Sequence, residues 1–221
     1  MLTICTLNKL IENPSNRMLI LINHPLSMFL VGVMATILTL LVLLSMMGAR
    51  NETGEMVKDY YRAMELAGDD GPAAGSEEES EAISSFINFL KNVGDPGYIQ
   101  ANTSKAYAAN AYLDDTIVTH HGPEEIQAYF LETAATMTGF ELKILDTVRS
   151  GSDHYIRWEM IFTAPKLANN TPIVSVGVSQ VRFNAAGQVA FHQDFWDSGK
   201  HIYGQIPLVG GIIQKIRGRM E

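Results

Sequence analysis

An uncharged segment from Leu26 to Met47 constrains this chain more than any other feature of its sequence. A helix of this length would be about 33 Å long, slightly more than the ~30 Å hydrocarbon core of a bilayer. Leu, Ile, Val and Phe dominate the segment, and their insertion free energies outweigh the small costs of its Ser and Thr residues. The sequence therefore predicts a transmembrane helix over residues 26–47, preceded by an N-terminal tail over residues 1–25.

Two alternatives compete with a transmembrane helix. A buried helix of a globular protein rarely stays apolar on every face for about six turns. The apolar region of a cleaved signal peptide is normally about 7–15 residues long and ends at a small-x-small site, whereas this segment is longer and closes on Met46-Met47-Gly48-Ala49. We therefore expect an uncleaved, single-pass membrane anchor.

The charges on either side of the anchor only weakly favour one orientation of the chain across the membrane. Positive charge accumulates on the cytoplasmic side of membrane helices. Three acidic residues are interspersed among the bases that follow the anchor, and the margin is a single charge. A cytoplasmic C-terminal domain is weakly favoured, from Lys9 and Arg17 before the anchor and Arg50, Lys58 and Arg62 after it.

Net charge and cysteine content exclude several classes of function. The chain has a formal net charge of −8 and no basic stripe, which argues against a nucleic-acid partner. Its single cysteine, Cys5, cannot form an intrachain disulfide or a cysteine-based metal site. The imidazoles of His120 and His121 would point to opposite faces of an extended chain and make a poor metal site. With no phosphate-binding loop or zinc motif present, we expect neither a metal nor a cofactor.

Residues 48–81 are expected to connect the anchor to a single folded domain. Apolar residues recur at helical spacing over residues 52–66, which predicts a short amphipathic helix leaving the membrane. The following stretch, Leu66 to Ala82, carries six acids, no base, three Gly and one Pro. Because such a composition offers little apolar surface against chain entropy, it predicts a flexible acidic linker.

Residues 82–221 read as one α+β domain. A helix is expected to begin at Ser80 and end near Gly94, a second helix to precede Tyr107, a short strand to lie near residues 111–114, and a third helix to run from Glu124 to about Met137. Helices followed by a run of antiparallel strands predict helices that cover one face of a curved sheet. The later strands are expected at Phe140–Arg149, His154–Thr163, Ile173–Phe183 and Val189–Asp197.

Four stretches of this domain resemble a known superfamily. They read YAANAYLDDT, HHGPEEIQAYF, YIRWEMIF and VSVGVSQVRFNAAGQVAFHQDFWDSG, in that order. Over about residues 82–200 the chain resembles the nuclear transport factor 2-like superfamily, in particular its SnoaL-like and ketosteroid-isomerase-like members. The resemblance implies a cone-shaped fold with a pocket between helices and sheet. It does not give an activity, because this scaffold hosts isomerases, hydrolases, cyclases and non-enzymatic binders.

The resemblance also places the isomerase's catalytic groups on this chain. Its catalytic base falls on Asp115, its protonated aspartate on Ser179, and its oxyanion-hole tyrosine near Ile87. Losing one such hydrogen-bond donor typically lowers the rate by ~10²–10³. Steroid isomerisation is therefore not expected.

Strand alternation gives an independent view of the pocket. On the last strand Ala190, His192, Asp194 and Trp196 share one face, which the resemblance places toward the cavity. These patterns predict an apolar pocket with a few polar groups, typical of a small-molecule site. The candidate ligand-binding residues are Ile156, Trp158, Met160, Ser179 and Trp196, and the candidate catalytic residues are Asp115, His192 and Asp194.

Each polar candidate has a structural alternative. His192 could be a general base held by Asp194, or a buried histidine that satisfies hydrogen bonds. Asp115 could be a base, or a loop carboxylate that caps a turn with Thr116. The two tryptophans could serve as core or as pocket wall. The tail, with its apolar run from Ile206 to Ile213 and three bases, could cap the open end of the cone or lie on an anionic membrane.

Three functions remain open on the sequence. The leading hypothesis is a membrane-anchored domain that binds a small, mainly apolar molecule in its cone pocket. The second is an acid–base enzyme of isomerase or hydrolase type that uses Asp115 or the His192–Asp194 pair. The third is a dimerising interaction module whose sheet face pairs with another copy, and a cone filled by side chains would favour it.

Overall fold

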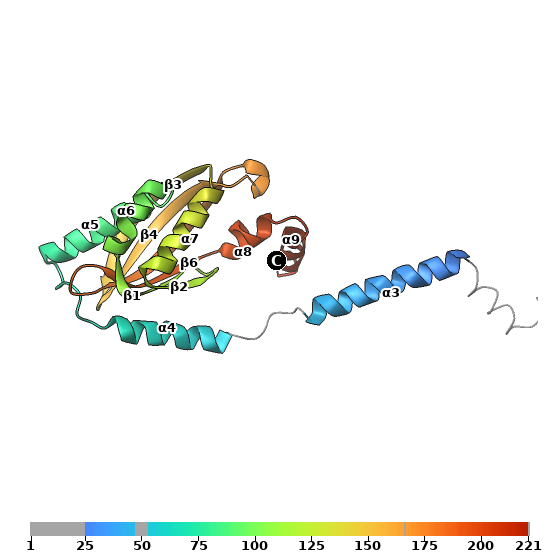
Figure 1. The fold of residues 1–221 in the computed structure, drawn as a ribbon, viewed down its shortest axis with the longest axis horizontal. Coiled ribbons are helices and arrows are strands. Elements are labelled where there is room, and N and C mark those ends of the chain that lie inside the picture. Colours follow the sequence, from blue (N-terminus) through green and yellow to red (C-terminus); the bar gives the residue numbers. More distant parts are fainter. Residues whose placement is uncertain (1–24, 47–52, 166, 221) are drawn as a thin grey trace, which may run out of the picture. The chain divides into compact units, whose positions relative to one another are not determined.

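The structure, a computed structural model, describes residues 25–46, 53–165 and 167–220 (Figure 1). It divides into two units, Met1–Gly54 and Glu55–Glu221, which we treat separately. Most of the predicted N-terminal tail lies outside the described residues, as do the flanking charges Lys9, Arg17 and Arg50.

The first unit contains helix α3, Pro25–Met46, at the position of the predicted anchor. Its described side chains, residues 28–43, are all exposed. Among the residues that the structure describes, no helix meets both the length and the hydropathy that crossing a membrane requires.

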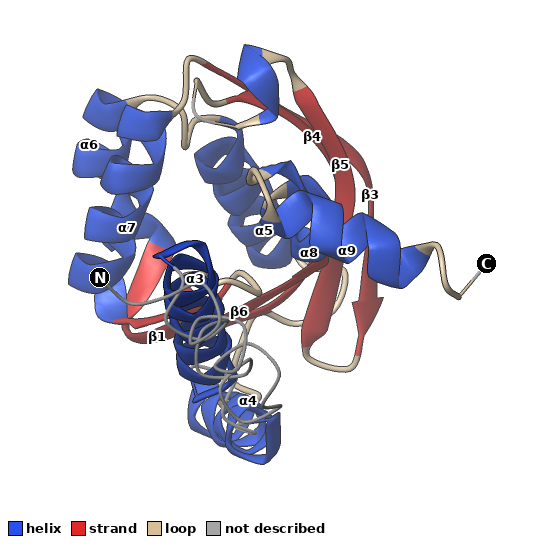
Figure 2. Ribbon diagram, turned by 90° about the vertical axis from the view of Figure 1, so that its right-hand side faces the viewer, coloured by secondary structure: helices blue, strands red, loops and turns tan. Residues whose placement is uncertain are grey.

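The second unit is built on a six-stranded sheet of order β2-β1-β6-β5-β4-β3. Only β1 and β6 pair in parallel, and the other neighbours are antiparallel. The sheet curves around the helices that pack on its inner face (Figure 2). The predicted α+β class is therefore confirmed. The strands are β1 Tyr107–Asp114, β2 Thr119–His121, β3 Gly139–Ser150, β4 Asp153–Thr163, β5 Ile173–Phe183 and β6 Val189–Trp196.

Three helices cover the inner face, close to their predicted positions. They are α5 Glu77–Lys91, α6 Pro96–Ala106 and α7 Gly122–Thr136. The carboxylate of Asp95 caps α6 by accepting from the N–H groups of Gly97 and Tyr98, and Pro96 begins the helix. The core between these helices and the sheet is rich in aromatic rings, with Phe86, Phe89 and Tyr107 almost fully buried.

Short elements complete the chain. A 3₁₀ turn, η1 Ala168–Asn170, lies between β4 and β5. After β6 the chain forms α8 Ser198–His201, η2 Tyr203–Gln205 and α9 Val209–Arg217.

Helix α4, Thr53–Ala67, packs on the sheet rather than only leading away from the anchor. Ala63 and Ala67 are buried against Tyr112 and Phe191, which point away from the inner core. The Tyr60 hydroxyl donates to Gln180 Oε1 over 2.7 Å. The amphipathic pattern of residues 52–66 therefore reflects packing on the outer face of the sheet.

The last residues of the predicted acidic linker, from Glu77 onward, lie in helix α5. Ser76 caps α5 through the N–H of Glu79, and three glutamates lie in the first turn of α5, where the positive end of the helix stabilises them. Glu79 is buried and binds Arg149 and His154 at 2.6 and 2.8 Å, while Asp69 pairs with Arg182. The composition alone predicts solvated acids, but Glu79 and Asp69 have specific partners. The compact unit begins at Glu55, before the predicted start of the domain at residue 82.

Strand alternation also fails at Ala190. Phe183 pairs with Val189 but Arg182 pairs with Phe191, so the register shifts by one residue between them. This irregularity places Ala190 with Phe191 in the outer cluster, instead of on the face of His192.

The buried carboxylate of Glu79 and its donors should make the stability of the domain depend on pH. The hydrogen bond from His154, then that from the Gly75 N–H, and the Arg149 guanidinium lower the pKa of Glu79 to about 2. Because the pKa is lower in the folded than in the unfolded chain, the stabilisation is complete above about pH 4.5 and is lost as pH falls toward 2. We expect Glu79→Gln to lower the free energy of unfolding at pH 7 by up to about 3 kcal/mol.

Urea denaturation followed by tryptophan fluorescence measures this difference at pH 7 and at pH 3. Glu78→Gln is the matched control, since Glu78 lies in the same turn and is exposed. A Glu79→Gln deficit that stays constant between the two pH values would contradict the ion-pair argument.

Candidate functional site

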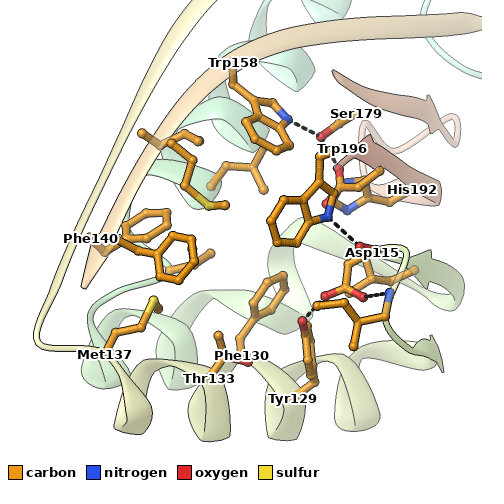
Figure 3. A pocket seen from close by; sticks show the side chains of 18 of the residues that line it. Asp115, Tyr129, Phe130, Thr133, Met137, Phe140, Trp158, Ser179, His192 and Trp196 are labelled. Atoms are coloured by element: carbon orange, nitrogen blue, oxygen red, sulfur yellow. Dashed lines mark hydrogen bonds and ion pairs between the residues drawn. The ribbon is translucent and has the colours of Figure 1, made fainter. Parts of the chain in front are cut away.

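A cavity of about 160 Å³ lies between the inner face of the sheet and helix α7 (Figure 3). Seven of the eight candidate residues line it, and they come from β4, β5, β6 and the loop after β1. The wall is mostly apolar: Leu90, Val93, Leu113, Ile117, Phe130, Met137, Phe140, Leu142, Trp158, Met160, Phe162, Trp196 and Ile202, with Asp115, Tyr129, Thr133, Ser179, His192 and Asp194 as the polar members.

Ile156 is the exception among the candidates. It faces the same side of β4 as Trp158 but is fully buried in the main core. The inward-facing residues of β4 run from the core to the cavity, and Ile156 lies at the core end. Ile156 is therefore not among the residues that line this cavity.

Hydrogen bonds converge on one oxygen of Asp194 at the polar end of the cavity. Oδ1 of Asp194 accepts from Ser179 Oγ at 2.5 Å and from His192 Nε2 at 2.9 Å. Ser179 Oγ in turn accepts from Trp158 Nε1 at 3.0 Å. Three neighbouring strands thus contribute to a single network that orients this carboxylate.

A buried tyrosine completes the network behind His192. The Tyr107 hydroxyl lies 2.9 Å from His192 Nδ1. An ionised Asp194 can only accept, so Nε2 must carry a hydrogen, and in the neutral imidazole Nδ1 then accepts from Tyr107. Burial, and then the charge of Asp194, raise the pKa of Tyr107 well above its ordinary value, so it remains a neutral donor. Both imidazole nitrogens are engaged, and His192 is not placed as a free general base.

Asp194 retains one oxygen without a partner. Among the described residues, Oδ2 of Asp194 accepts no hydrogen bond. Its side chain lines the cavity and is 17 % exposed, whereas that of His192 is 2 % exposed. Oδ2 is therefore the atom of the network that is available to a ligand.

Asp115 has no such free oxygen. Its Oδ1 accepts from the N–H groups of Ile117 and Val118 at 2.9 and 3.0 Å, and its Oδ2 accepts from the Tyr129 hydroxyl. Burial and the charge of Asp115 raise the pKa of Tyr129, which keeps this donor protonated. Asp115 therefore holds the loop after β1 in place, and the N–H of Thr116 binds Asp114 instead.

Both tryptophans belong to the wall, and the N–H group of each has an acceptor. Trp196 Nε1 donates to the backbone carbonyl of Asp115 at 2.7 Å. Trp158 lies across the neighbouring strand at Gly177, where an added Cβ would come within 2.4 Å of the ring. The absence of a side chain at Gly177 gives the Trp158 indole its position beside the cavity.

Several lining residues were not predicted from the sequence. Tyr129 and Phe130 belong to the helix stretch that carried the resemblance, so that stretch could have identified them. Tyr107 also begins a quoted stretch, but only packing reveals its bond to His192. Ile202 belongs to the tail, where no pattern pointed to the cavity.

The charge of the site is negative. Asp115 and Asp194 are its carboxylates, and no Lys or Arg is among the lining residues. His120 packs on Tyr129 and His121 on Tyr112, at ring distances of 4.7 and 5.7 Å. Within the described residues, no group of three or more His, Cys, Asp or Glu is arranged to hold a metal ion.

The chain is similar to several proteins of known structure. A SnoaL-like candidate polyketide cyclase from Jannaschia sp. CCS1 is 12 % identical, with a TM-score of 0.51, covering 62 % of this chain and 99 % of that one. A protein with a ketosteroid isomerase-like fold from Catenulispora acidiphila, in complex with trimethylamine, is 16 % identical, with a TM-score of 0.47 and coverage of 55 % and 93 %. An LEH-like epoxide hydrolase from M. tuberculosis is 16 % identical, with a TM-score of 0.45 and coverage of 63 % and 96 %.

At 12 % identity the structure from Jannaschia, with its TM-score above 0.5, shows the fold alone. Curated protein sequences give no match. Residues 100–192 match the SnoaL-like domain family. This part of the chain is therefore a SnoaL-like domain.

Proposed function

We propose that the domain binds a small, mainly apolar molecule that is neutral or cationic and donates a hydrogen bond to Asp194. The observation that carries this proposal is the free Oδ2 of Asp194 in an apolar cavity lined by no Lys or Arg. An anionic ligand would face two carboxylates without a compensating base. A cavity of about 150 Å³ accommodates benzene in another protein, so the buried part of the ligand is about the size of one six-membered ring.

An unfilled cone also supports ligand binding over a pure interaction module. A module that only pairs its sheet with a second copy does not need a cavity of about 160 Å³ between its sheet and its helices. Helix α4 covers part of the outer sheet face, although Val174 and Val176 on that face are exposed. Homodimerisation remains compatible with ligand binding.

The ligand proposal predicts a specific order of binding among ring-sized probes. Benzyl alcohol should bind, benzoate should bind at least about tenfold more weakly, and Asp194→Asn should weaken benzyl alcohol by about tenfold or more, because hydrogen bonds to charged groups contribute ~1.5–3 kcal/mol. Toluene has no donor and serves as the matched control, with little change on Asp194→Asn. Trp158 and Trp196 are the only tryptophans and both line the cavity, so their fluorescence reports binding.

Benzoate binding as tightly as benzyl alcohol would overturn the assignment of ligand charge. Native mass spectrometry of the purified chain can then identify a ligand that co-purifies. A co-purified carboxylic acid would contradict the proposal in the same way.

A second candidate function is proton transfer at the same carboxylate. Its support is that Oδ1 of Asp194 is fixed by Ser179 and His192, while Oδ2 has no partner among the described residues and could remove a proton from a carbon acid or water bound in the cavity. Asp194, rather than Asp115 or His192, is then the catalytic residue. His192 and Tyr107 act as positioning residues behind it.

Deuterium exchange into cyclohexanone tests this candidate without knowledge of the substrate. Asp194 would take an α-proton onto Oδ2, leaving the enolate, which then receives a deuteron from the exchanged carboxyl group. The chain should accelerate exchange in D₂O, and Asp194→Asn should slow it by about 10²-fold or more. Asp115→Asn, the matched control, should retain most of the activity because both oxygens of Asp115 are engaged. Equal losses in the two variants would contradict the assignment.

We also propose that residues 26–47 anchor the chain in a membrane as a single pass, with the domain weakly favoured on the cytoplasmic side. The uncharged sequence supports this, and α3 is helical over Pro25–Met46. The hydroxyls of Thr36 and Thr39 donate to the carbonyls of Gly32 and Ala35 at 2.9 and 2.8 Å. Neither hydroxyl would therefore be left unsatisfied in hydrocarbon.

Carbonate extraction tests the anchor. The intact chain should remain in the membrane pellet, because an inserted apolar helix resists treatment that removes peripheral proteins. A chain deleted through residue 50 should appear in the supernatant. Intact chain in the supernatant, or a mature N-terminus near Ala49, would overturn the proposal.

A further inference from the structure

The C-terminal helix α9 presents an apolar stripe that the described part of the chain does not cover. Val209, Ile212 and Ile216 follow the spacing of one helix face, and they are 41, 61 and 50 % exposed. Leu208, immediately before α9, is 87 % exposed. Contiguous exposed apolar side chains of this kind mark contact surfaces in soluble domains.

Helix α9 is fixed to the domain by a different side. Gly210 is buried, and a Cβ at this position would come within 2.2 Å of the Gly204 carbonyl in η2. Arg217 pairs with Asp197 at the end of β6 over 3.1 Å. The contacts of Gly210 and Arg217 hold the helix in this orientation. The stripe, on a different side of the helix, therefore stays exposed.

Leu208 is also held in a costly backbone conformation. Its φ angle is 69°, in the left-handed region that non-glycine residues rarely adopt. A β-branched or large residue there adds strain that the surrounding structure must compensate. Leu208, which adopts this strained conformation, is also more exposed than any residue of the stripe.

The charge around the stripe is opposite to that of the chain as a whole. Residues 198–220 contain no acid, whereas the full chain carries a net charge of −8. Lys215, Arg219 and Lys200 form no ion pair within the described residues. An apolar helix face bordered by basic side chains is typical of helices that lie in the interface of an anionic bilayer.

We propose that α9 docks on an anionic lipid surface, with Leu208, Val209, Ile212 and Ile216 among the acyl chains and Lys215 and Arg219 at the headgroups. The adjoining segment contributes Ile202 to the cavity wall, so docking brings one wall of the ligand site to the membrane. This inference does not depend on the ligand of the cavity.

Site-specific fluorescence on the full chain tests the docking. In a Cys5→Ser background, Ile212→Cys carries an environment-sensitive dye, and Gln214→Cys, on another side of α9, is the matched control. With vesicles of phosphatidylglycerol and phosphatidylcholine, the dye at position 212 should shift to the blue and resist iodide quenching, whereas the dye at 214 should not. Vesicles of phosphatidylcholine alone should leave both dyes accessible.

Charge removal gives the second arm of the test. Lys215→Gln with Arg219→Gln should shift the docking equilibrium toward the undocked state by about 30-fold, because two basic contacts with the anionic surface are lost. A dye at position 212 that stays accessible to iodide on anionic vesicles would overturn the proposal. So would a blue shift that appears without lipid and grows with protein concentration, which would assign the stripe to a second copy of the chain.

Discussion

The edge-to-face contact between Phe86 and His192 links the core of this domain to its site. The two rings lie 5.2 Å apart at 89°, and Phe86 also packs against Phe89, Tyr107 and Phe183. This aromatic cluster fills the inner face of the sheet beneath α5 but does not extend to the end where Trp158 and Trp196 lie. The ring whose position orients Asp194 is therefore fixed by packing as well as by hydrogen bonds. Loss of packing at Phe86 would reach the cavity even though Phe86 does not line it.

The hydrogen bonds that compensate the burial of the two carboxylates explain which of them keeps an oxygen without a partner. Burying Asp115 and Asp194 in an apolar setting requires that donors compensate the lost water. Asp115 receives donors on both oxygens, whereas those of Asp194 converge on Oδ1. Two residues of the same type in one cavity thus differ in their hydrogen-bond partners, and only Asp194 keeps an oxygen without a partner among the described residues.

The sequence was sufficient to predict the positions of the helices and strands, but it did not predict the irregularities within the strands. Strand limits from Phe140 onward agree with the structure to within about two residues, because alternation and turn residues are local properties. The shift at Ala190 and the burial of Ile156 depend on pairing and on the depth of the core, which a single strand does not encode.

Partners distant in sequence account for the other differences. The sequence alone suggests that Asp69 and Glu79 are solvated, because their partners, Arg149, His154 and Arg182, lie about 70 or more residues away. Strand alternation and the resemblance together predicted the candidate site. Distinguishing between Asp115, His192 and Asp194 required the positions of their hydrogen-bond partners in the structure. The contribution of Ile202 depends on the path of the chain after β6, and no residue pattern specifies that path.

The hydrogen bonds around Asp115 also bear on how a molecule could enter and leave. Backbone N–H groups, the Tyr129 hydroxyl and the Trp196 indole all bind this residue, so the loop after β1 forms a rigid side of the cavity. The side formed by Ile202 belongs to a short segment between α8 and η2, and Ile202 itself is only half-buried. Opening on that side would break fewer bonds than opening at the loop. Exchange of a ligand would then be governed by the rate at which the C-terminal segment moves, independently of how tightly the cavity holds its occupant.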